Sequence, residues 1–344
     1  MRNRIFYQSE GLFVGPTGTG ALLQLHRIQS ANHTETINRT PVNELGHIGQ
    51  LDRVILAAPT VSLTFEALLA NAVNAKRLGF NTDGTVTCIA PILTGGQDQK
   101  NYYIAVSNEG TDLLATTGNG VFGFGNGFIS NAAFAGAVGG FPTESYTVDA
   151  LNYCAFPISS GDGLTVNQSN GLPITGNPFV IPVGTTGVAG TPAALQPGDI
   201  TVTIADTLGF VTNELKIQNF NITIPLARED LGALGSKFAF AKFITFPVTV
   251  TTTFSTVAGS IAQGCLAEKL CSDAPVNLSI SLREPNCEGT GNVMIKFDVK
   301  GVKLDSTNFS TSLTANATVD FNYSCQLGGP SETTIGCFIS GISS

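Results

Sequence analysis

The chain has 344 residues, of which 42% are hydrophobic and only 12% are charged, and its formal net charge is −8. Disordered chains combine low hydrophobicity with high charge, so this composition indicates a folded globular protein with room for two or three domains. No run of Lys or Arg forms a basic patch, which argues against a protein that grips a nucleic-acid backbone; an acidic surface suits one that DNA slides past.

The first 27 residues are expected to form a strand or arm, a glycine-rich turn and a second strand. They contain no apolar segment of signal-peptide length, so synthesis in a cytoplasm is expected. The seven cysteines form no Cys-x-x-Cys pair, and no zinc site is indicated. In a reducing cytoplasm these cysteines are expected to be buried thiols, and a disulfide formed after release remains open.

A segment at 28–65 returns at 217–254 without a gap, and twelve of the 38 aligned pairs are identical. Chance matching would give about two or three identities. The identical pairs are Ile28/Ile217, Gln29/Gln218, Asn32/Asn221, Thr34/Thr223, Arg39/Arg228, Leu45/Leu234, Gly46/Gly235, Ile55/Ile244, Thr60/Thr249, Val61/Val250, Thr64/Thr253 and Phe65/Phe254. A repeat of this length predicts a duplicated domain. The alternative is two unrelated strands of similar composition.

Each copy of the repeat begins with a predicted strand, continues through a turn-rich segment and enters a second predicted strand. The signal is the alternation of apolar and polar residues, which is the period of a half-buried strand. The residues expected on the buried faces are Phe220 and Ile222 with Ile224, Val61 with Leu63 and Phe65, and Val250 with Phe254.

A short helix is expected after the second strand of each copy. In the first copy apolar residues recur at helical spacing from Leu68 to Val73, and Gly79 is a suitable C-terminal stop. In the second copy Leu266 and Leu270 have this spacing, and Pro275 halts the helix. Both helices are expected to cover an open face of a sheet.

The last part of each copy is expected to be β again. The segments 276–284 and 292–299 alternate, and TVDALNYC at 147–154 resembles TVDFNYSC at 318–325 with small shifts in register. The fold class is therefore predicted as mainly β, with two tandem duplicated domains at 1–157 and 200–344. Between them, 158–199 is rich in Gly, Pro and Thr and is expected to be a linker or a loop excursion.

An uncharged stretch at 113–143 contains many Gly, Asn and Thr residues. These residues interrupt it too often for a membrane-spanning helix. It is interpreted as a long glycine-rich loop between strands, and the alternative is a loop that lines a wall or lumen or inserts into a membrane.

No pattern predicts an enzyme, a cofactor site or a metal site. The loop GPTGTG at 15–20 lacks the Lys and the hydroxyl residue of a phosphate loop, because Ala21 and Leu22 stand in their places. The pattern Gly118-x-Gly120-x-x-Gly123 has no strand–turn–helix unit around it. The three histidines are not repeated in the second copy, and the carboxylates form no cluster suited to acid–base catalysis.

Arg39 and Arg228 occupy the same point of the repeat, ahead of a turn-rich loop in a chain that has few charges. Either residue is interpreted as a solvated loop arginine, as one that anchors its loop to a carboxylate of the same domain, or as one partner of an ion pair between subunits. The residues alone leave these alternatives open.

The chain resembles the major tail tube proteins of long-tailed bacteriophages in a pattern that both copies share. The pattern is a strand, an Arg followed after five residues by Leu-Gly, a Pro-led strand, a short helix and further strands. It falls on Arg39, Leu45, Gly46 and Pro59, and again on Arg228, Leu234, Gly235 and Pro247. The resemblance covers both copies and leaves 158–199 unexplained.

The resemblance implies a β-sandwich or partly closed barrel in each domain, with a flanking helix, and gives those eight residues a role in assembly. One sheet of each domain joins its neighbours to line a channel, a long loop reaches from ring to ring, and DNA passes through without specific binding. Since this chain carries two domains, three chains are expected to form one ring of pseudo-six-fold symmetry, and rings to stack. Edge strands left unpaired in a monomer are then covered by neighbouring domains.

The implied location is the tail of a virion made in the cytoplasm of a bacterial host. The implied partners are other copies of the chain, tail initiator and terminator proteins and, in a contractile tail, sheath proteins, with no membrane and no cofactor. Two alternatives remain open. One is another viral or surface β-sandwich, such as a capsid, decoration or adhesion protein, and the other is a membrane-active protein that uses the 113–143 segment.

Overall fold

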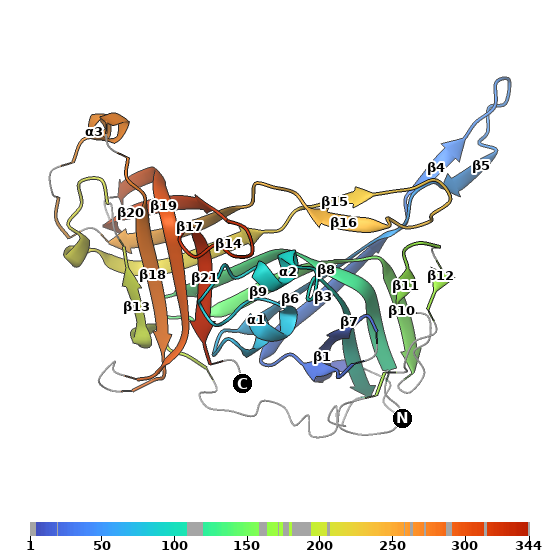
Figure 1. Cartoon of the computed structure of the whole chain (residues 1–344), viewed down its shortest axis with the longest axis horizontal. Coiled ribbons are helices and arrows are strands. Elements are labelled where there is room, and N and C mark those ends of the chain that lie inside the picture. Colours follow the sequence, from blue (N-terminus) through green and yellow to red (C-terminus); the bar gives the residue numbers. More distant parts are fainter. Residues whose placement is uncertain are drawn as a thin grey trace.

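The computed structural model describes residues 5–18, 20–108, 120–157, 164–170, 172–174, 179–180, 194–204, 207–257, 259–261, 264–271, 273–286, 291–312 and 315–342. The predicted mainly β class is confirmed: the chain is mainly β, with short helices (Figure 1). We call the part from β1 to β10 the first half and the part from β13 to β21 the second half. In the described part of the chain, no helix is long and apolar enough to span a membrane.

The first half contains β1 (Ile5–Pro16), β2 (Leu23–Gln24), β3 (Ile28–Thr36), β4 (Arg39–Val42), β5 (Asp52–Ile55), β6 (Thr60–Leu68), α1 (Val73–Leu78), α2 (Ala90–Leu93), β7 (Gln99–Asn108), β8 (Gly120–Ala137), β9 (Thr143–Ala150) and β10 (Asn152–Pro157). Between the halves lie β11 (Val166–Asn167), β12 (Leu172–Pro173) and the 3-10 turn η1 (Pro197–Asp199).

The second half contains β13 (Ile200–Thr203), the 3-10 turn η2 (Thr212–Glu214), β14 (Lys216–Pro225), β15 (Arg228–Leu231), β16 (Ala241–Ile244), β17 (Thr249–Val257), α3 (Leu266–Cys271), β18 (Val276–Arg283), β19 (Val293–Ser312), β20 (Ala315–Gln326) and β21 (Gly336–Gly341).

The two halves have the same strand order in one large antiparallel sheet. In the first half β3, β6, β9, β8, β7 and β1 are neighbours in that order, and β10 also pairs with β8. In the second half β14, β17, β20, β19, β18 and β13 follow the same order, and β21 also pairs with β19. Each half also has a separate two-stranded arm, β4–β5 and β15–β16.

The halves also share irregularities of strand register. The pairing of β3 with β6 shifts between Ile28 and Ser30, and that of β14 with β17 shifts between Ile217 and Asn219. The other matching shifts are Lys100/Tyr102 with Val276/Leu278, and Ile129/Asn131 with Leu304/Ser306. Because the register shifts occur at matching points, the strands of the two halves can be aligned residue by residue.

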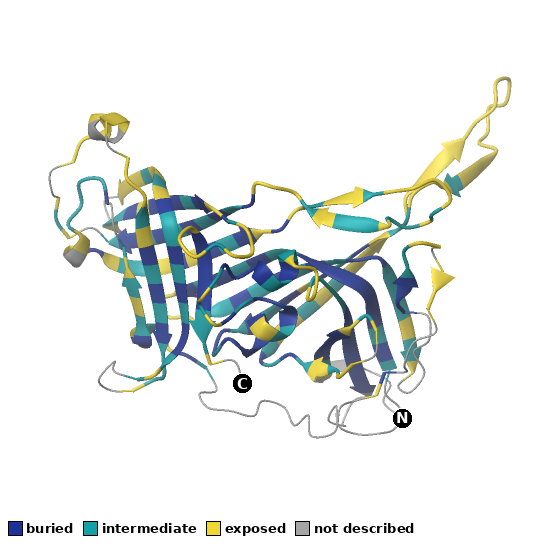
Figure 2. Cartoon of the chain, in the orientation of Figure 1, coloured by how far each residue is buried: buried dark blue, intermediate teal, exposed yellow. Residues whose placement is uncertain are grey.

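The core lies on one side of these strands, and the predicted alternation places it correctly. Val61, Leu63 and Phe65 are buried, and so are Phe220, Ile222, Ile224, Val250 and Phe254. Figure 2 shows the resulting stripes of buried and more exposed residues along the strands. One contiguous apolar cluster runs through both halves, so the halves share a core.

Helix α1 begins five residues after β6 ends and stops at Gly79, which adopts φ +104° as its predicted role requires. A buried polar network ties this helix to the sheet. The amide Nδ2 of Asn74 donates to Glu144 Oε1 at 2.7 Å and to the carbonyl of His26 at 2.9 Å, and Tyr146 Oη donates to Glu144 Oε2 at 2.8 Å.

Helix α3 does not cover a sheet face, so that prediction is wrong for the second half. Leu266 is 74% exposed and Leu270 is 90% exposed, and Figure 1 places α3 away from the body of the sheet. The apolar residues lie on a helix, as predicted, but Leu266 and Leu270 are not covered by the part of the chain that the structure describes.

The interpretation of 113–143 as a loop is also wrong for its described part, because Gly120–Ala137 is the strand β8. Its glycines serve packing. A Cβ at Gly127 would lie 2.8 Å from the ring of Tyr102, and one at Gly125 would collide with the Leu164 carbonyl. Glycine therefore permits close approach of neighbouring segments. It also has a low strand propensity, so the sequence pattern did not predict β8 as a strand.

The match between TVD at 147–149 and TVD at 318–320 is out of register in the structure. Val61 pairs with Ala150 on β9, whereas its counterpart Val250 pairs with Cys325 on β20. Thr147 therefore corresponds to Asn322, four residues further along.

Part of the 158–199 segment packs against the first half. Leu164 and Phe179 are buried in a small second cluster with Phe13, Tyr103 and Val121. The domain boundaries at 157 and 200 stay a prediction.

Candidate assembly interface

The two halves meet through a pair of strands, β8 and β14. Their antiparallel register runs from Asn219 opposite Ala137 to Pro225 opposite Asn131. On its other side the same part of β8 pairs with β9, and β14 pairs with β17. The sheet therefore passes from one half to the other through a continuous hydrogen-bonded ladder, which we call the internal junction.

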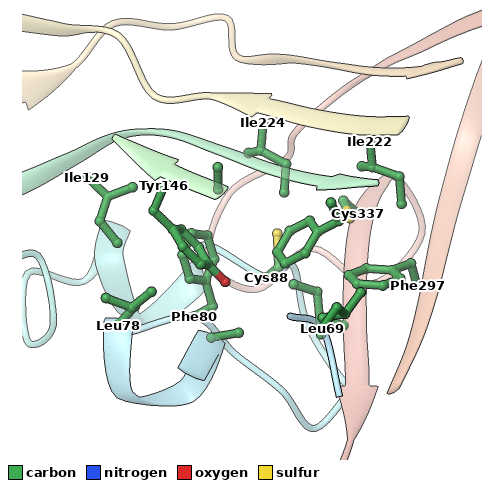
Figure 3. Close-up of a cluster of buried hydrophobic side chains, with 14 of the residues drawn as sticks. Leu69, Leu78, Phe80, Cys88, Ile129, Tyr146, Ile222, Ile224, Phe297 and Cys337 are labelled. Carbon is green, nitrogen blue, oxygen red and sulfur yellow. The ribbon is translucent and has the colours of Figure 1, made fainter. Parts of the chain in front are cut away.

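Apolar side chains fill the core-facing side of the internal junction (Figure 3). Phe134 of β8 stands opposite Ile222 of β14, and both are fully buried. The ring of Phe134 packs at a centroid distance of 4.7 Å on Phe297, which lies on β19 of the second half. Burying one such side chain contributes roughly 1.5–3 kcal/mol, so the junction is a stable part of the fold.

A second contact joins β21 of the second half to the segment around α1 and α2. Backbone N–H groups of Ala72 and Cys88 donate to the carbonyls of Ile342 and Cys337, each at 2.9 Å. The thiols of Cys88 and Cys337 are both buried and free (Figure 3). A side-chain hydrogen bond to Cys88, which the Cys337 thiol makes only while it is protonated, and burial raise the pKa of Cys337 well above its ordinary value.

Cysteine burial differs from the prediction at other positions. Cys325 is buried as predicted, whereas Cys154 is half-buried, and Cys265 and Cys271 of the α3 region are exposed. Cys287 lies outside the described residues.

A third contact is made by the arm β15–β16, which lies over the first half (Figure 1). Arg228 binds Asp98 of the first half in a bidentate pair, with Nη2 to Oδ1 at 2.6 Å and Nη1 to Oδ2 at 3.1 Å. Its Nε donates to the carbonyl of Ile129 at 3.2 Å, and its guanidinium lies 4.9 Å from the Phe128 ring centroid. The Arg228 side chain is only 2% exposed.

The ion pair of Arg228 thus crosses between the halves of one chain. Arg228 is therefore neither a solvated loop arginine nor one that is anchored to a carboxylate of its own half. Bidentate Arg–carboxylate pairs combine charge with fixed geometry, so this pair sets the direction of the arm. Further along the arm, Ser236 Oγ donates to the Gln168 carbonyl at 2.9 Å and Gln168 Nε2 donates to the Ala239 carbonyl at 3.1 Å.

The arm β4–β5 has the same register but points away from the body (Figure 1). Arg39 stands opposite Ile55, as Arg228 stands opposite Ile244. Arg39 is exposed, and within the described part of the chain its side chain makes no hydrogen bond or ion pair.

The predicted Leu-Gly pairs lie at the two arm tips. Leu45 and Leu234 are fully exposed, and Gly46 and Gly235 adopt φ +86° and +90°. Pro59 and Pro247 lie instead just before β6 and β17, and Phe246–Pro247 is a cis peptide bond. The structure thus brings Arg228 against Asp98 of the first half. The Leu-Gly pairs at the tips are left uncovered by the part of the chain that the structure describes.

We expect Gly46→Arg with Gly235→Arg to prevent ordered assembly while the free energy of unfolding changes by only about 1 kcal/mol per site. The physical reasons are bulk and charge at exposed tips and the strain of a side chain at positive φ. Electron microscopy and thermal unfolding measure the two effects. The Gly46→Ala, Gly235→Ala pair has the same strain without the bulk, and loss of assembly in that pair too would show that the tip conformation matters rather than contact area.

The two strand segments that correspond to those of the internal junction form edges of the sheet in the described residues. Each has a paired neighbour on one side only, and they lie at opposite edges of the sheet. β3 corresponds to β14, and in the described residues it pairs only with β6. Residues 306–312 of β19 correspond to 131–137 of β8, and in the described residues they pair only with β20. One chain therefore carries both partners of a second junction on opposite edges, where they cannot meet.

The sheet face opposite the core is polar over β3, β6, β9, β8, β14, β17, β20 and β19. Its paired side chains are mostly hydroxyl, amide or alanine groups, such as Thr64, Ala133 and Thr253. Among the paired residues described on this face, the carboxylates are Glu66, Asp149 and Asp320, and the lysines are Lys216 at the start of β14 and Lys303 within β19. A polyanion has few cations to bind along such a face.

No protein-family model matches the chain, and a search of curated proteins finds no relative. In the described residues no group of His, Cys, Asp and Glu is arranged to hold a metal ion. Sequence reasoning did not find Asp98, because it lies 130 positions from Arg228 and has no counterpart in the aligned repeat.

Proposed function

We propose that this chain is a structural virion protein that assembles with copies of itself into stacked rings, which form the tail tube of a long-tailed bacteriophage. Three chains, each with two equivalent halves, make one ring of pseudo-six-fold symmetry. The observation that carries this proposal is the internal junction, whose two strands recur, uncovered, at opposite edges of the same sheet. Repetition of one head-to-tail contact gives a ring when its rotation closes.

The polar sheet face supports the role of a channel for DNA. In a closed ring this face would be continuous from chain to chain, with neutral hydroxyl and amide groups and scattered carboxylates. Such a wall repels the phosphate backbone weakly and offers few cations for counterion release, so DNA passes without being held. Tail initiator, terminator and sheath proteins are proposed partners at the ends and outside of the tube.

A second candidate is another β-rich virion or adhesion protein, which the mainly β fold also suits. The membrane-active alternative relies on 113–143 as a free loop. Residues 113–119 lie outside the described residues, and residues 120–137 form β8, which pairs with β7, β9, β10 and β14 and therefore supports this alternative less.

Negative-stain electron microscopy of the purified, concentrated chain tests the proposal. We expect hollow tubes or stacked rings whose end views repeat three times. Discrete monomers at all concentrations would contradict self-assembly by this chain alone and would favour the decoration or adhesion protein.

A further inference from the structure

A cluster of aromatic side chains lies half-exposed at the open edge of β3. His33 of β3 stacks on Tyr153 of β10 at 5.1 Å between ring centroids and lies 5.8 Å from Phe122 of β8. Tyr153 and Phe122 are themselves stacked at 6.4 Å. We call these three residues the aromatic cup. It rests on the buried ring of Phe124, whose centroid lies 5.3 Å from that of His33.

The internal junction contains the corresponding positions with an occupant in place, and these positions are less aromatic because Cys337 corresponds to Tyr153. By the strand registers, Phe297 corresponds to Phe122 and Ile222 corresponds to His33. The occupant there is Phe134, which stands opposite Ile222 and packs on Phe297. The aromatic cup lies in the first half. The corresponding site lies in the second half, and there Phe134 of the first half is the occupant.

The counterpart of Phe134 is Phe309, on the open part of β19. Phe309 stands opposite the buried Val319, so it is on the core-facing side of the sheet. Its ring stacks on that of Phe210 at 6.4 Å between centroids, yet Phe309 is still 54% exposed. A large apolar side chain that stays this exposed on the core side of an uncovered strand edge indicates that a further partner covers it. Within one chain, β3 and this part of β19 lie at opposite edges of the sheet.

We propose that Phe309 of one copy occupies the aromatic cup of a second copy, and that residues 306–312 of the first pair antiparallel with residues 30–36 of the second. The register is that of the internal junction. It places Phe309 opposite His33 and Ser310 opposite Asn32, as Phe134 is opposite Ile222 and Ala135 is opposite Asn221. The proposal rests on the self-assembly proposed above and names the surfaces and register that carry it.

Two neighbouring features fit the same contact. Ile37, just after β3, is exposed, whereas its counterpart Leu226 is fully buried and its N–H donates to the Ser130 carbonyl at 2.9 Å. Leu266 and Leu270 are exposed on α3, which follows β17 in the second half as α1 follows β6 in the first, where β21 contacts the neighbouring segment. The strand that corresponds to β21 in the first half is β10, which carries Tyr153 of the aromatic cup. In the second copy, β10 is therefore the strand that α3 of the first copy would approach.

The proposed contact is more polar than the internal junction. Glu35 stands on the core-facing side of β3 where Ile224 stands on β14, and its Oε2 lies 3.6 Å from His33 Nε2. A carboxylate on the core side of an edge strand discourages indiscriminate strand pairing. The contact between copies is therefore selective for a partner strand with small or hydroxyl groups at that rung, such as Thr307.

Disulfide cross-linking tests the register. The parent chain has Cys265, Cys271 and Cys287 replaced by Ser, and it receives Asn32→Cys with Ser310→Cys. Directly opposed residues of an antiparallel pair have Cα atoms about 4.5–5.5 Å apart, within the range of a disulfide. The matched control carries Asn32→Cys with Ser306→Cys, which the proposed register separates by four residues along the strand.

We expect the Asn32/Ser310 pair to give cross-linked species on mild oxidation, in a ladder that stops at three chains, while the control pair and the parent do not. Cross-linking of the control pair alone, or of neither pair, would overturn the proposal. Hollow tubes without cross-linking of the Asn32/Ser310 pair would leave the proposed function standing and refute this contact. Cross-linking in an open ladder beyond three chains would support the contact and contradict the three-chain ring.

A second variant tests the cup itself. We expect Phe309→Ala to raise the protein concentration needed for half-maximal cross-linking by about tenfold or more, because the contact loses a buried aromatic side chain. Phe309 is partly exposed in the single chain, so thermal unfolding should show a folded protein. Phe141→Ala removes a similarly exposed ring from a loop outside the contact, and an equal effect of that change would contradict a role for the cup.

Discussion

Replacing Asp98 by Ala is expected to destabilise the folded chain by about 2–3 kcal/mol and to release the arm β15–β16 from the first half. The change leaves the Arg228 guanidinium, 2% exposed, without its carboxylate partner. Removing one member of a buried ion pair is costly because the other charge stays desolvated. The expected loss is smaller than the roughly 3–5 kcal/mol typical of breaking a fully buried ion pair. The reason is that the Asp98 side chain is 21% exposed and water reaches part of the site. Urea unfolding measures the loss.

The reverse change, Arg228→Met, is expected to cost about 1 kcal/mol. Met keeps an apolar stem against Phe128, and Asp98 can take up water once its partner is gone. The double variant would then be more stable than the sum of the single losses implies, and this difference is the coupling between the two residues.

A matched control lies on the same arm. Asp230 pairs with Lys242 at 3.1 Å, but the Asp230 side chain is 58% exposed. Asp230→Ala is therefore expected to change stability by less than about 0.5 kcal/mol. Equal losses for Asp98→Ala and Asp230→Ala would contradict the view that the Arg228 pair holds the arm.

Replacing Glu144 by Gln is expected to remove a strong dependence of stability on pH. Burial raises the pKa of Glu144 from its ordinary 4.5 to about 7, although hydrogen bonds from Asn74 and Tyr146 and the charge of Arg27 act in the opposite direction. Between pH 4.5 and 7 the folded chain keeps a proton that the unfolded chain has released. Stability from this group is therefore fully present below pH 4.5 and is lost as the pH rises through 7.

The size of this loss is on the order of 3 kcal/mol, since one pKa unit corresponds to about 1.4 kcal/mol. Gln can accept from Asn74 and donate to the Tyr146 oxygen, so it keeps the network without a charge. The stability of Glu144→Gln relative to wild type should therefore rise by up to that amount between pH 4.5 and pH 8.

The difference between variant and wild type must be followed, rather than one unfolding curve. Burial, with the charges of Arg77 and Arg27, lowers the pKa of His26 to about 4, so its contribution to stability falls as the pH drops from 6.5 to 4, opposite to that of Glu144. His26 remains in both proteins, and its effect cancels in the difference. Glu66→Gln, on the polar face of β6, is the control. A flat difference for Glu144→Gln would refute a buried neutral carboxyl.

The elements that sequence reasoning placed correctly are those whose side chains alternate or recur within one segment. The alternation of Val61, Leu63 and Phe65 predicts a half-buried strand from its own segment alone, and Gly79 marks the end of α1. β8 failed this test because its glycines are chosen for contact with Tyr102 and Leu164, which lie far away in sequence. Local propensity cannot represent such a requirement.

The candidate interface could be predicted only in part. The repeat drew attention to Arg39 and Arg228 at matching positions, but the partner Asp98 comes from a part of the chain outside the aligned block. The aromatic cup combines β3, β8 and β10, and each of its residues is unremarkable in its own segment. Only the shared registers of the two halves relate it to Phe309.

Covalent linkage of the two halves gives the internal junction an effective concentration that no bimolecular contact has. Every chain forms one junction during its own folding, so an assembly of such chains has half of its joints already closed when subunits first meet. The proposed joints between chains would involve His33 and Glu35 where the internal junction has Ile222 and Ile224. Growth and dissociation would therefore proceed by whole chains, with breakage at the joints between chains rather than within them.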